Sequence, residues 1–143
     1  MSAERSESIA RVAEMMRDID FCMLTTNSGT GRLRARPMST NGQVEFDGEV
    51  WFFSGAHTRK VADVESEPRV QLSFARPDDF RFISMTGEAS IIRDDEKKKA
   101  LWLEELERWF PQGPESDDVV LIKVTPSIVT WWVGEEGGEI MLD

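Results

Sequence analysis

The sequence holds one cysteine, Cys22, and one histidine, His57. A single cysteine cannot form a disulfide within the chain and cannot supply a thiolate metal cluster. No spaced set of Cys, Asp and Glu residues accompanies His57, so we expect no metal site and interpret His57 as a polar loop residue. Cys22 lies in an apolar stretch, where a cysteine more often packs in the core than acts as a nucleophile.

Positive charge and long apolar runs are also scarce. The chain has 17 Lys and Arg residues against 27 Asp and Glu residues, a formal net charge of -10. A field of that sign repels phosphate, so we expect neither nucleic acid nor an anionic membrane as a partner. No apolar stretch is long enough to span a bilayer, and the N-terminal run SAERSES lacks the apolar region of a signal peptide. We therefore expect a cytoplasmic protein.

The 143 residues, 40% of them hydrophobic, fit one globular domain over 1–143. Strands are predicted at 21–26, in the arginine-rich stretch up to Thr40, and at 50–54, 70–74, 80–92, 119–124 and 128–133. Helices are predicted at 4–18, at 59–65, and from Asp94 onward with Leu103, Leu106, Trp109 and Phe110 on one face. Gly87 indicates a bulge, Pro126 should end or kink its strand, and the acidic, glycine-rich tail is predicted without a strand.

The predicted strands cluster with turn signals between them and do not alternate with long helices. This pattern favours a mainly β fold with peripheral helices: six or seven antiparallel strands, closed as a small barrel with helices at its rim.

The stretch GRLRARPMST gathers three arginines in this acidic chain. Arg32, Arg34 and Arg36 alternate, so a strand places them on one face. A solvated outer face explains Arg32 and Arg34 as well as a ligand does. Arg36 differs because Pro37, which follows it, removes a ladder donor and therefore requires a strand edge or a bulge. Such a place leaves backbone and side-chain groups available to a ligand.

A second cationic cluster, Thr58-Arg59-Lys60, opens the helix predicted at 59–65. The free N–H groups and the positive dipole of a helix start bind anions, and the hydroxyls of Ser54 and Thr58 add donors. Thr58 is the expected N-cap, with its hydroxyl accepting from a backbone N–H. Cations conflict with the dipole here, and such a conflict is tolerated where a ligand compensates it. The alternative is that Arg59 and Lys60 are ordinary surface residues.

Five tryptophans complete the candidates. Trp51 and Trp102 are expected in the core. Trp109, Trp131 and Trp132 lie at element ends, where they could stack on a planar ligand or bury a dimer interface. Packing alone remains the alternative for each.

Short motifs follow one another from Phe21 to Trp132: FCMLTT (21–26), RARPM (34–38), WFFS (51–54), TRKV (58–61), PRV (68–70), WFP (109–111) with Gly113, VTP (124–126) and WW (131–132). Together they resemble the pyridoxamine 5'-phosphate oxidase-like family of FMN-binding split barrels, and most closely its short general-stress-protein branch. This resemblance implies a homodimer of split β-barrels with FMN in grooves at the subunit interface. It implies that Arg36, Arg59, Lys60 and the Thr58 hydroxyl hold the flavin phosphate. The full implied cofactor-binding set is Arg36, Pro37, Met38, Ser39, Phe53, Ser54, Thr58, Arg59, Lys60, Phe82 and Trp132, with Trp132 and as a further candidate Trp109 contributed by the partner subunit.

The implied function is that of an FMN-dependent oxidoreductase of unknown substrate, with a role in stress response. The alternatives are a flavin carrier or sensor without turnover and a relative that binds a deazaflavin; haem is disfavoured because His57 is the sole imidazole. Members that oxidise pyridoxamine phosphate end in a basic, His-containing segment, whereas this chain ends GEEGGEIMLD. Oxidation of pyridoxamine phosphate is therefore not expected. No catalytic residue is assigned, because hydride transfer by a flavin needs no dedicated general base.

Overall fold

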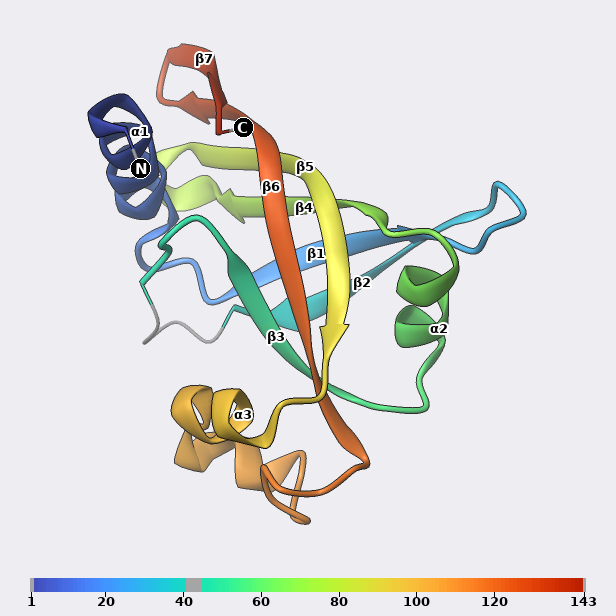
Figure 1. The fold of residues 1–143 in the computed structure, drawn as a ribbon. Coiled ribbons are helices and arrows are strands. Elements are labelled where there is room, and N and C mark those ends of the chain that lie inside the picture. The colour runs from blue at the N-terminus through green and yellow to red at the C-terminus, as the bar shows by residue number, and fades with distance from the viewer. Residues whose placement is uncertain (1, 41–44, 143) are drawn as a thin grey trace.

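The computed structural model describes residues 2–40 and 45–142. Within these residues one antiparallel sheet of seven strands has the order β2-β1-β4-β5-β6-β3, with β7 paired to β6 (Figure 1). The strands are β1 (Phe21–Asn27), β2 (Leu33–Ser39), β3 (Val50–Gly55), β4 (Arg69–Arg76), β5 (Arg81–Ile92), β6 (Val119–Val133) and β7 (Glu136–Met141). The helices are α1 (Ala3–Met16), α2 (Arg59–Ser66) and α3 (Asp95–Leu101), with short 3-10 turns η1 (Pro77–Asp79) and η2 (Glu104–Arg108).

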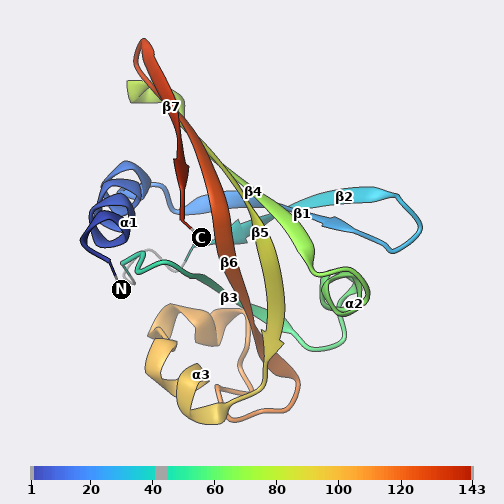
Figure 2. The ribbon, with the colours of Figure 1, turned by 45° about the horizontal axis from the view of Figure 1, so that its top comes forward.

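The sheet curls upon itself, as the turned view in Figure 2 shows. In the part of the chain that the structure describes, β2 and β3 form the two ends of the strand order and do not pair with each other, so the barrel is split. The three helices lie at separate places around it: α1 beside β7, α2 beside the β1–β2 hairpin, and α3 at the opposite end (Figure 1). The predicted fold class is confirmed.

The core lies on the inward face of the sheet. Alternate strand positions point there, as the period of two predicts, and α1 adds Ile9, Val12, Ala13 and Met15. Leu24, Phe52, Leu72 and Met85 are fully buried. Burying one such side chain contributes about 1.5–3 kcal/mol, so this face fixes which side of every strand looks inward.

The β1–β2 hairpin has the predicted position, with Phe21 opposite Ser39 and Leu24 opposite Arg36. Among the described residues β2 pairs with β1 alone, which makes it an edge strand. Pro37 is tolerated there because an edge strand needs ladder bonds on one side only. The edge predicted from Pro37 is confirmed.

The predicted bulge at Gly87 is also confirmed, because the β5–β6 register shifts between Thr86 and Gly87. A Cβ at Gly87 would lie 2.7 Å from the Cα of Pro126, so only glycine fits this close approach. Pro126 does not divide the region into two strands: β6 runs unbroken from Val119 to Val133. The prediction of a separate strand at 128–133 was wrong, because the bulge accommodates a residue that lacks an N–H.

Two further predictions fail at the C-terminal half. The tail forms strand β7, which pairs with β6 through a tight turn at Gly134. Gly138 lies directly under the ring of Trp131, where a Cβ would be 2.9 Å from the nearest ring atom, so a glycine-rich strand suits this place. The long helix after Asp94 is absent as such: α3 ends at Leu101 and η2 follows after a break.

The buried Lys98 holds α3 in place. Its Nζ donates to the carbonyl oxygens of Ser116 (3.0 Å) and Val119 (2.9 Å) and lies 3.0 Å from an Asp95 carboxylate oxygen. These contacts tie α3 to the segment that enters β6. None of the helices in residues 2–40 and 45–142 is long and apolar enough to cross a membrane.

Candidate functional site

The structure brings the two predicted cationic clusters together. Arg36 lies on the edge strand β2, and Lys60 lies in the first turn of α2, which packs against β1 and β5. The pKa of Lys60 is lowered, first by partial burial of its side chain and then by the positive charge of Arg36. Two cations therefore face the same small region between β2 and the start of α2.

Asp63 is the member of this site that sequence reasoning missed. It lies on α2 with only 4% of the residue exposed, between the buried Val61 and Val64. The Arg34 guanidinium donates two hydrogen bonds to its carboxylate, from Nη2 to Oδ1 at 3.0 Å and from Nε to Oδ2 at 3.3 Å. The signal was present, because an acid on the apolar face of a predicted helix needs a cationic partner.

These contacts set the protonation state of Asp63. The hydrogen bonds from Arg34 lower its pKa most; the Thr26 hydroxyl and the charges of Arg34 and Arg36 lower it further, while burial opposes them. The Thr26 Oγ1 donates to Asp63 Oδ2 at 2.8 Å. Asp63 is therefore an ionised carboxylate at neutral pH, and the Arg34 guanidinium forms an ion pair with it.

Arg36 is held by its own set of acceptors. Its Nη1 donates to Thr26 Oγ1 (2.8 Å) and to the backbone oxygens of Leu24 (3.1 Å) and Arg34 (3.3 Å). Its Nη2 lies 3.8 Å from Asp63 Oδ2. The pKa of Arg36 is lowered by burial, and the nearby Asp63 opposes that effect. The side chain is thus fixed in place at the sheet edge.

Lys60 lacks such compensation. In the described part of the chain no carboxylate oxygen lies within 4 Å of its Nζ, whereas Arg34 has Asp63. Arg34 and Arg36 thus share the carboxylate of Asp63, and the third cation, Lys60, has no such partner among the described residues. A partly desolvated cation without a counter-ion is costly, so this surplus indicates a place for an anion.

The hydroxyls near Lys60 do not behave as predicted. Thr58 is the N-cap residue of α2, but its side chain caps no N–H; its Oγ1 donates to the Gly55 oxygen at 3.1 Å. The buried Ser54 hydroxyl donates to the same oxygen at 2.9 Å and lies 3.2 Å from Thr58 Oγ1. The predicted capping bond was wrong because the Gly55 carbonyl competes for the Thr58 hydroxyl. The first N–H groups of α2 therefore have no side-chain cap in the described residues.

The other predicted cofactor-binding residues differ in their exposure to solvent. Met38 is buried toward the core, whereas Pro37 and Ser39 are exposed. Phe53 packs edge-on against Trp102, with ring centroids 5.2 Å apart. Arg59 is exposed at the start of α2.

Phe82 and Trp132 face each other directly across the β5–β6 pair, and Phe82 packs edge-on against Phe80 at 4.9 Å. They lie on the outward face of the sheet, since their neighbours Ile83 and Trp131 point into the core. Arg36 lies on the inward side, opposite the buried Leu24. One chain by itself therefore does not bring these two aromatic side chains to the cationic cluster.

The tryptophans differ in exposure. Trp132 is 46% exposed and Trp109 is 70% exposed, so packing within the chain leaves both available. Trp131 is a core residue with 7% exposure and with the Arg11 guanidinium 4.6 Å from its ring centroid, so packing, the alternative given for it, accounts for its position. Trp51 and Trp102, expected in the core, are only partly buried.

Other large apolar side chains are exposed along the outward face, from Trp132 on β6 to Leu33 at the start of β2. Met23 of β1 lies opposite Pro37 of β2 and Ser73 of β4 at the middle of this face. The exposed apolar set comprises Phe21, Met23, Leu33, Phe80, Trp132 and Met141, together here called the outward apolar face. An apolar surface of this kind on a strongly charged protein is typical of a contact surface.

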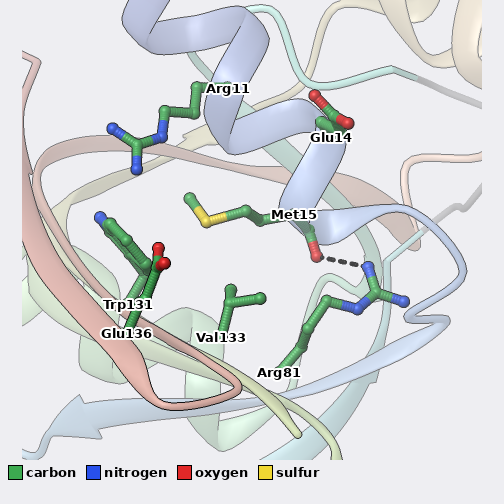
Figure 3. Close-up of a pocket in the computed structure, with 7 residues that line it drawn as sticks. All are labelled: Arg11, Glu14, Met15, Arg81, Trp131, Val133 and Glu136. Atoms are coloured by element: carbon green, nitrogen blue, oxygen red, sulfur yellow. Dashed lines mark hydrogen bonds between the residues drawn. The ribbon is translucent and has the colours of Figure 1, made fainter. Parts of the chain in front are cut away.

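A cavity of about 350 Å³ lies elsewhere, between α1 and the β6–β7 hairpin (Figure 3). Met15, Trp131 and Val133 line it, and Arg81 closes one side by donating to the carbonyl oxygens of Met15 and Arg17, both at 2.9 Å. Its described lining includes none of the predicted cofactor residues. Arg81 serves there as a brace that holds the end of α1 to β5.

The single cysteine, Cys22, and the single histidine, His57, lie in different surroundings. Burial raises the pKa of the Cys22 thiol to about 12, so it stays protonated and packs in the core as predicted. The His57 Nε2 lies 3.5 Å from an Asp118 carboxylate oxygen, with both side chains exposed.

Comparison with known proteins connects this geometry to a family. The sequence model of the family described as "Pyridoxamine 5'-phosphate oxidase like" matches residues 7–142. Protein bli-3 of Neurospora crassa is 26% identical over 127 residues, which cover 82% of this chain and 61% of bli-3. The chain thus spans about three fifths of the length of that curated relative.

Two solved structures show the same fold. A Clostridium acetobutylicum protein related to general stress protein 26 superposes with a TM-score of 0.80 at 18% identity, covering 96% of both chains. The general stress FMN/FAD binding protein of Xanthomonas citri superposes with a TM-score of 0.76 at 21% identity, covering 91% of both chains.

Replacement of Asp63 by asparagine should make the unfolding free energy of the protein less dependent on pH in the acidic range. The folded pKa of Asp63 lies below its ordinary value of 3.8, so its contribution is present above that pH and is lost as the pH falls through the folded pKa. We expect Asp63→Asn to lower the unfolding free energy at pH 7 by about 1–3 kcal/mol. The difference from the wild type should shrink as the pH falls below 3.8. Urea unfolding over a pH series measures both quantities.

The matched control is Glu65→Gln, an exposed acid on the same helix that lies 3.6 Å from Arg93. An exposed pair of this kind contributes about 0–1 kcal/mol. A loss for Asp63→Asn that equals the control, or that persists unchanged at low pH, would contradict the buried ion pair.

Proposed function

The chain belongs to the pyridoxamine 5'-phosphate oxidase-like family, and from this premise we propose that it binds FMN and acts as an FMN-dependent oxidoreductase. One observation carries the proposal: Arg36 and Lys60 form a partly buried pair of cations, and Lys60 has no carboxylate among the described residues. In a chain of net charge -10, this local surplus supports a bound anion.

A phosphate monoester fits this surplus. It brings up to two negative charges and several acceptor oxygens, which match the donors of Arg36 other than the engaged Nη1, the ammonium of Lys60 and the uncapped N–H groups at the start of α2. Arg59 is exposed at the same helix start and adds a further charge. We assign the phosphate group of FMN to Arg36, Arg59 and Lys60.

The flavin ring requires a flat, apolar surface. We assign it to the stretch from Pro37 to Ser39 and to the partner subunit's outward face, where Trp132 and Phe82 lie. A homodimer supplies both parts, because one chain keeps its aromatic pair away from its own cations. The printed name of the Xanthomonas citri relative, an FMN/FAD binding protein, supports a flavin as the ligand.

A bound flavin would supply the chemistry, accepting and donating a hydride. The side chains of this chain would bind and orient it: the cations hold its phosphate, and the apolar surfaces keep water from the ring. No general base is assigned.

Removal of either cation should weaken FMN binding. Loss of a charge-assisted contact costs about 1.5–3 kcal/mol, so we expect Lys60→Ala and Arg36→Ala each to raise the FMN Kd about tenfold to a hundredfold. Fluorescence titration of apoprotein with FMN measures this. Arg32→Ala is the control, because Arg32 belongs to the same arginine stretch but is exposed. Unchanged affinity in both test variants would refute the phosphate assignment.

Reduction by a nicotinamide donor separates an enzyme from a carrier. We expect the visible absorption of the bound FMN to bleach under NADH or NADPH without oxygen, and to return when a suitable acceptor is added. Failure of both donors to bleach it would favour the carrier or sensor alternative. A colourless protein that takes up no added FMN would overturn the proposed function itself, and a deazaflavin spectrum would replace FMN.

A charge at the centre of the outward apolar face should prevent dimer formation. Met23→Glu places a carboxylate between Pro37 and Ser73, where the proposed dimer would have to desolvate it. We expect the wild type to sediment as a dimer and Met23→Glu as a monomer. Ser90→Glu, at an exposed position of β5 near its other end, should remain a dimer. A monomeric wild type would contradict the proposal.

A further inference from the structure

We propose that Asp63 is a positioning residue, which acts through Thr26 to aim Arg36 at the phosphate and withdraws Arg34 from it. The inference rests on the proposed FMN binding and concerns a residue that does not itself touch the cofactor. Because a carboxylate repels phosphate, its presence beside a phosphate site needs an explanation.

The first step is the direction of the Thr26 hydroxyl. A hydroxyl has one proton to donate, and Thr26 gives it to Asp63 Oδ2 at 2.8 Å. Its oxygen is then left as an acceptor, and Arg36 Nη1 donates to it at 2.8 Å. The negative charge of Asp63 thus orients the hydroxyl, and the oriented hydroxyl holds one nitrogen of Arg36.

The second step concerns the other arginine. Arg34 lies two residues from Arg36 on the same face of β2, and its charge lowers the pKa of Arg36. The two bonds of Arg34 to Asp63 turn its guanidinium toward α2 and cancel its charge. Without the carboxylate, the charge of Arg34 would be uncompensated and would repel Arg36 at the sheet edge.

The third step is the order of groups along the site. Lys60 and Asp63 are three residues apart on α2, so they share a face of the helix. Arg36 interacts with both residues: its Nη2 is 3.8 Å from Asp63 Oδ2, and its positive charge lowers the pKa of Lys60. One helix therefore carries both the phosphate ligand and the group that fixes the second ligand.

Comparison of FMN with riboflavin, which lacks the phosphate, isolates this role. The quantity of interest is the riboflavin Kd divided by the FMN Kd, here called the phosphate ratio. We expect Asp63→Asn to lower the phosphate ratio about tenfold while the riboflavin Kd stays the same. An asparagine brings an amide N–H to face Arg34 or Thr26, so the relay through the hydroxyl is lost although the side-chain shape is kept.

Thr26 provides the matched pair that keeps the test decisive if Asp63→Asn folds poorly. Thr26→Ser keeps the hydroxyl and should keep the phosphate ratio. Thr26→Val keeps the shape but removes the relay, so it should lower the ratio as Asp63→Asn does. Both positions are buried, and circular dichroism of each variant verifies its fold.

Three results would overturn the inference. An unchanged phosphate ratio with lower stability would make Asp63 a structural residue only. A raised ratio would mean that the carboxylate merely repels the phosphate. Equal loss in the two Thr26 variants would exclude the hydroxyl relay. A wild type that binds neither flavin would instead refute the proposed function and this inference with it.

Discussion

The ion pair between Asp63 and Arg34 is the contact on which the arrangement of β2 and α2 depends. Two arginines point from the edge strand toward the start of a helix that carries a third cation, and this crowding of charge would separate the elements if nothing opposed it. The buried Asp63 carboxylate neutralises Arg34 and, through the Thr26 hydroxyl, holds Arg36 in place. The positive charges of Arg36 and Lys60 then exceed the negative charge near them. Charge compensation here is partial, and the uncompensated part is the basis of the proposed anion site.

The split of the barrel makes this arrangement accessible. Because β2 and β3 end the strand order without pairing to each other in the described residues, β2 keeps a free edge, and Pro37 prevents that edge from extending the ladder. The loop after β3 then delivers α2 toward the same region, since β3 ends at Gly55 and α2 begins at Arg59. A closed barrel would have paired this edge and left no room for the proposed anion between strand and helix.

Much of this was predictable from local sequence, and what was missed depends on distant contacts. The alternation in β1, β2 and β3 and the proline in β2 predicted the strands and the open edge, because each signal lies within a few residues. The strand β7 was missed since its glycines are explained only by the Trp131 ring that lies over them. The position of α3 was not predictable, since Lys98 ties it to carbonyl oxygens at the other end of a loop. Asp63 was missed because its partners Thr26 and Arg34 come from two other elements.

The proposed site would need two chains. Within one chain the sheet separates the cations from the aromatic pair, because adjacent strand positions point to opposite faces. No rotation of side chains moves Phe82 or Trp132 through a sheet whose inward face is fully packed. A ligand with a charged phosphate at one end and a flat ring at the other therefore meets only half of its requirements on a single chain. A second copy, laid against the outward apolar face, would bring its own Trp132 to the edge where the first copy holds Arg36 and Lys60, and burial of that face would stabilise the same contact that completes the site.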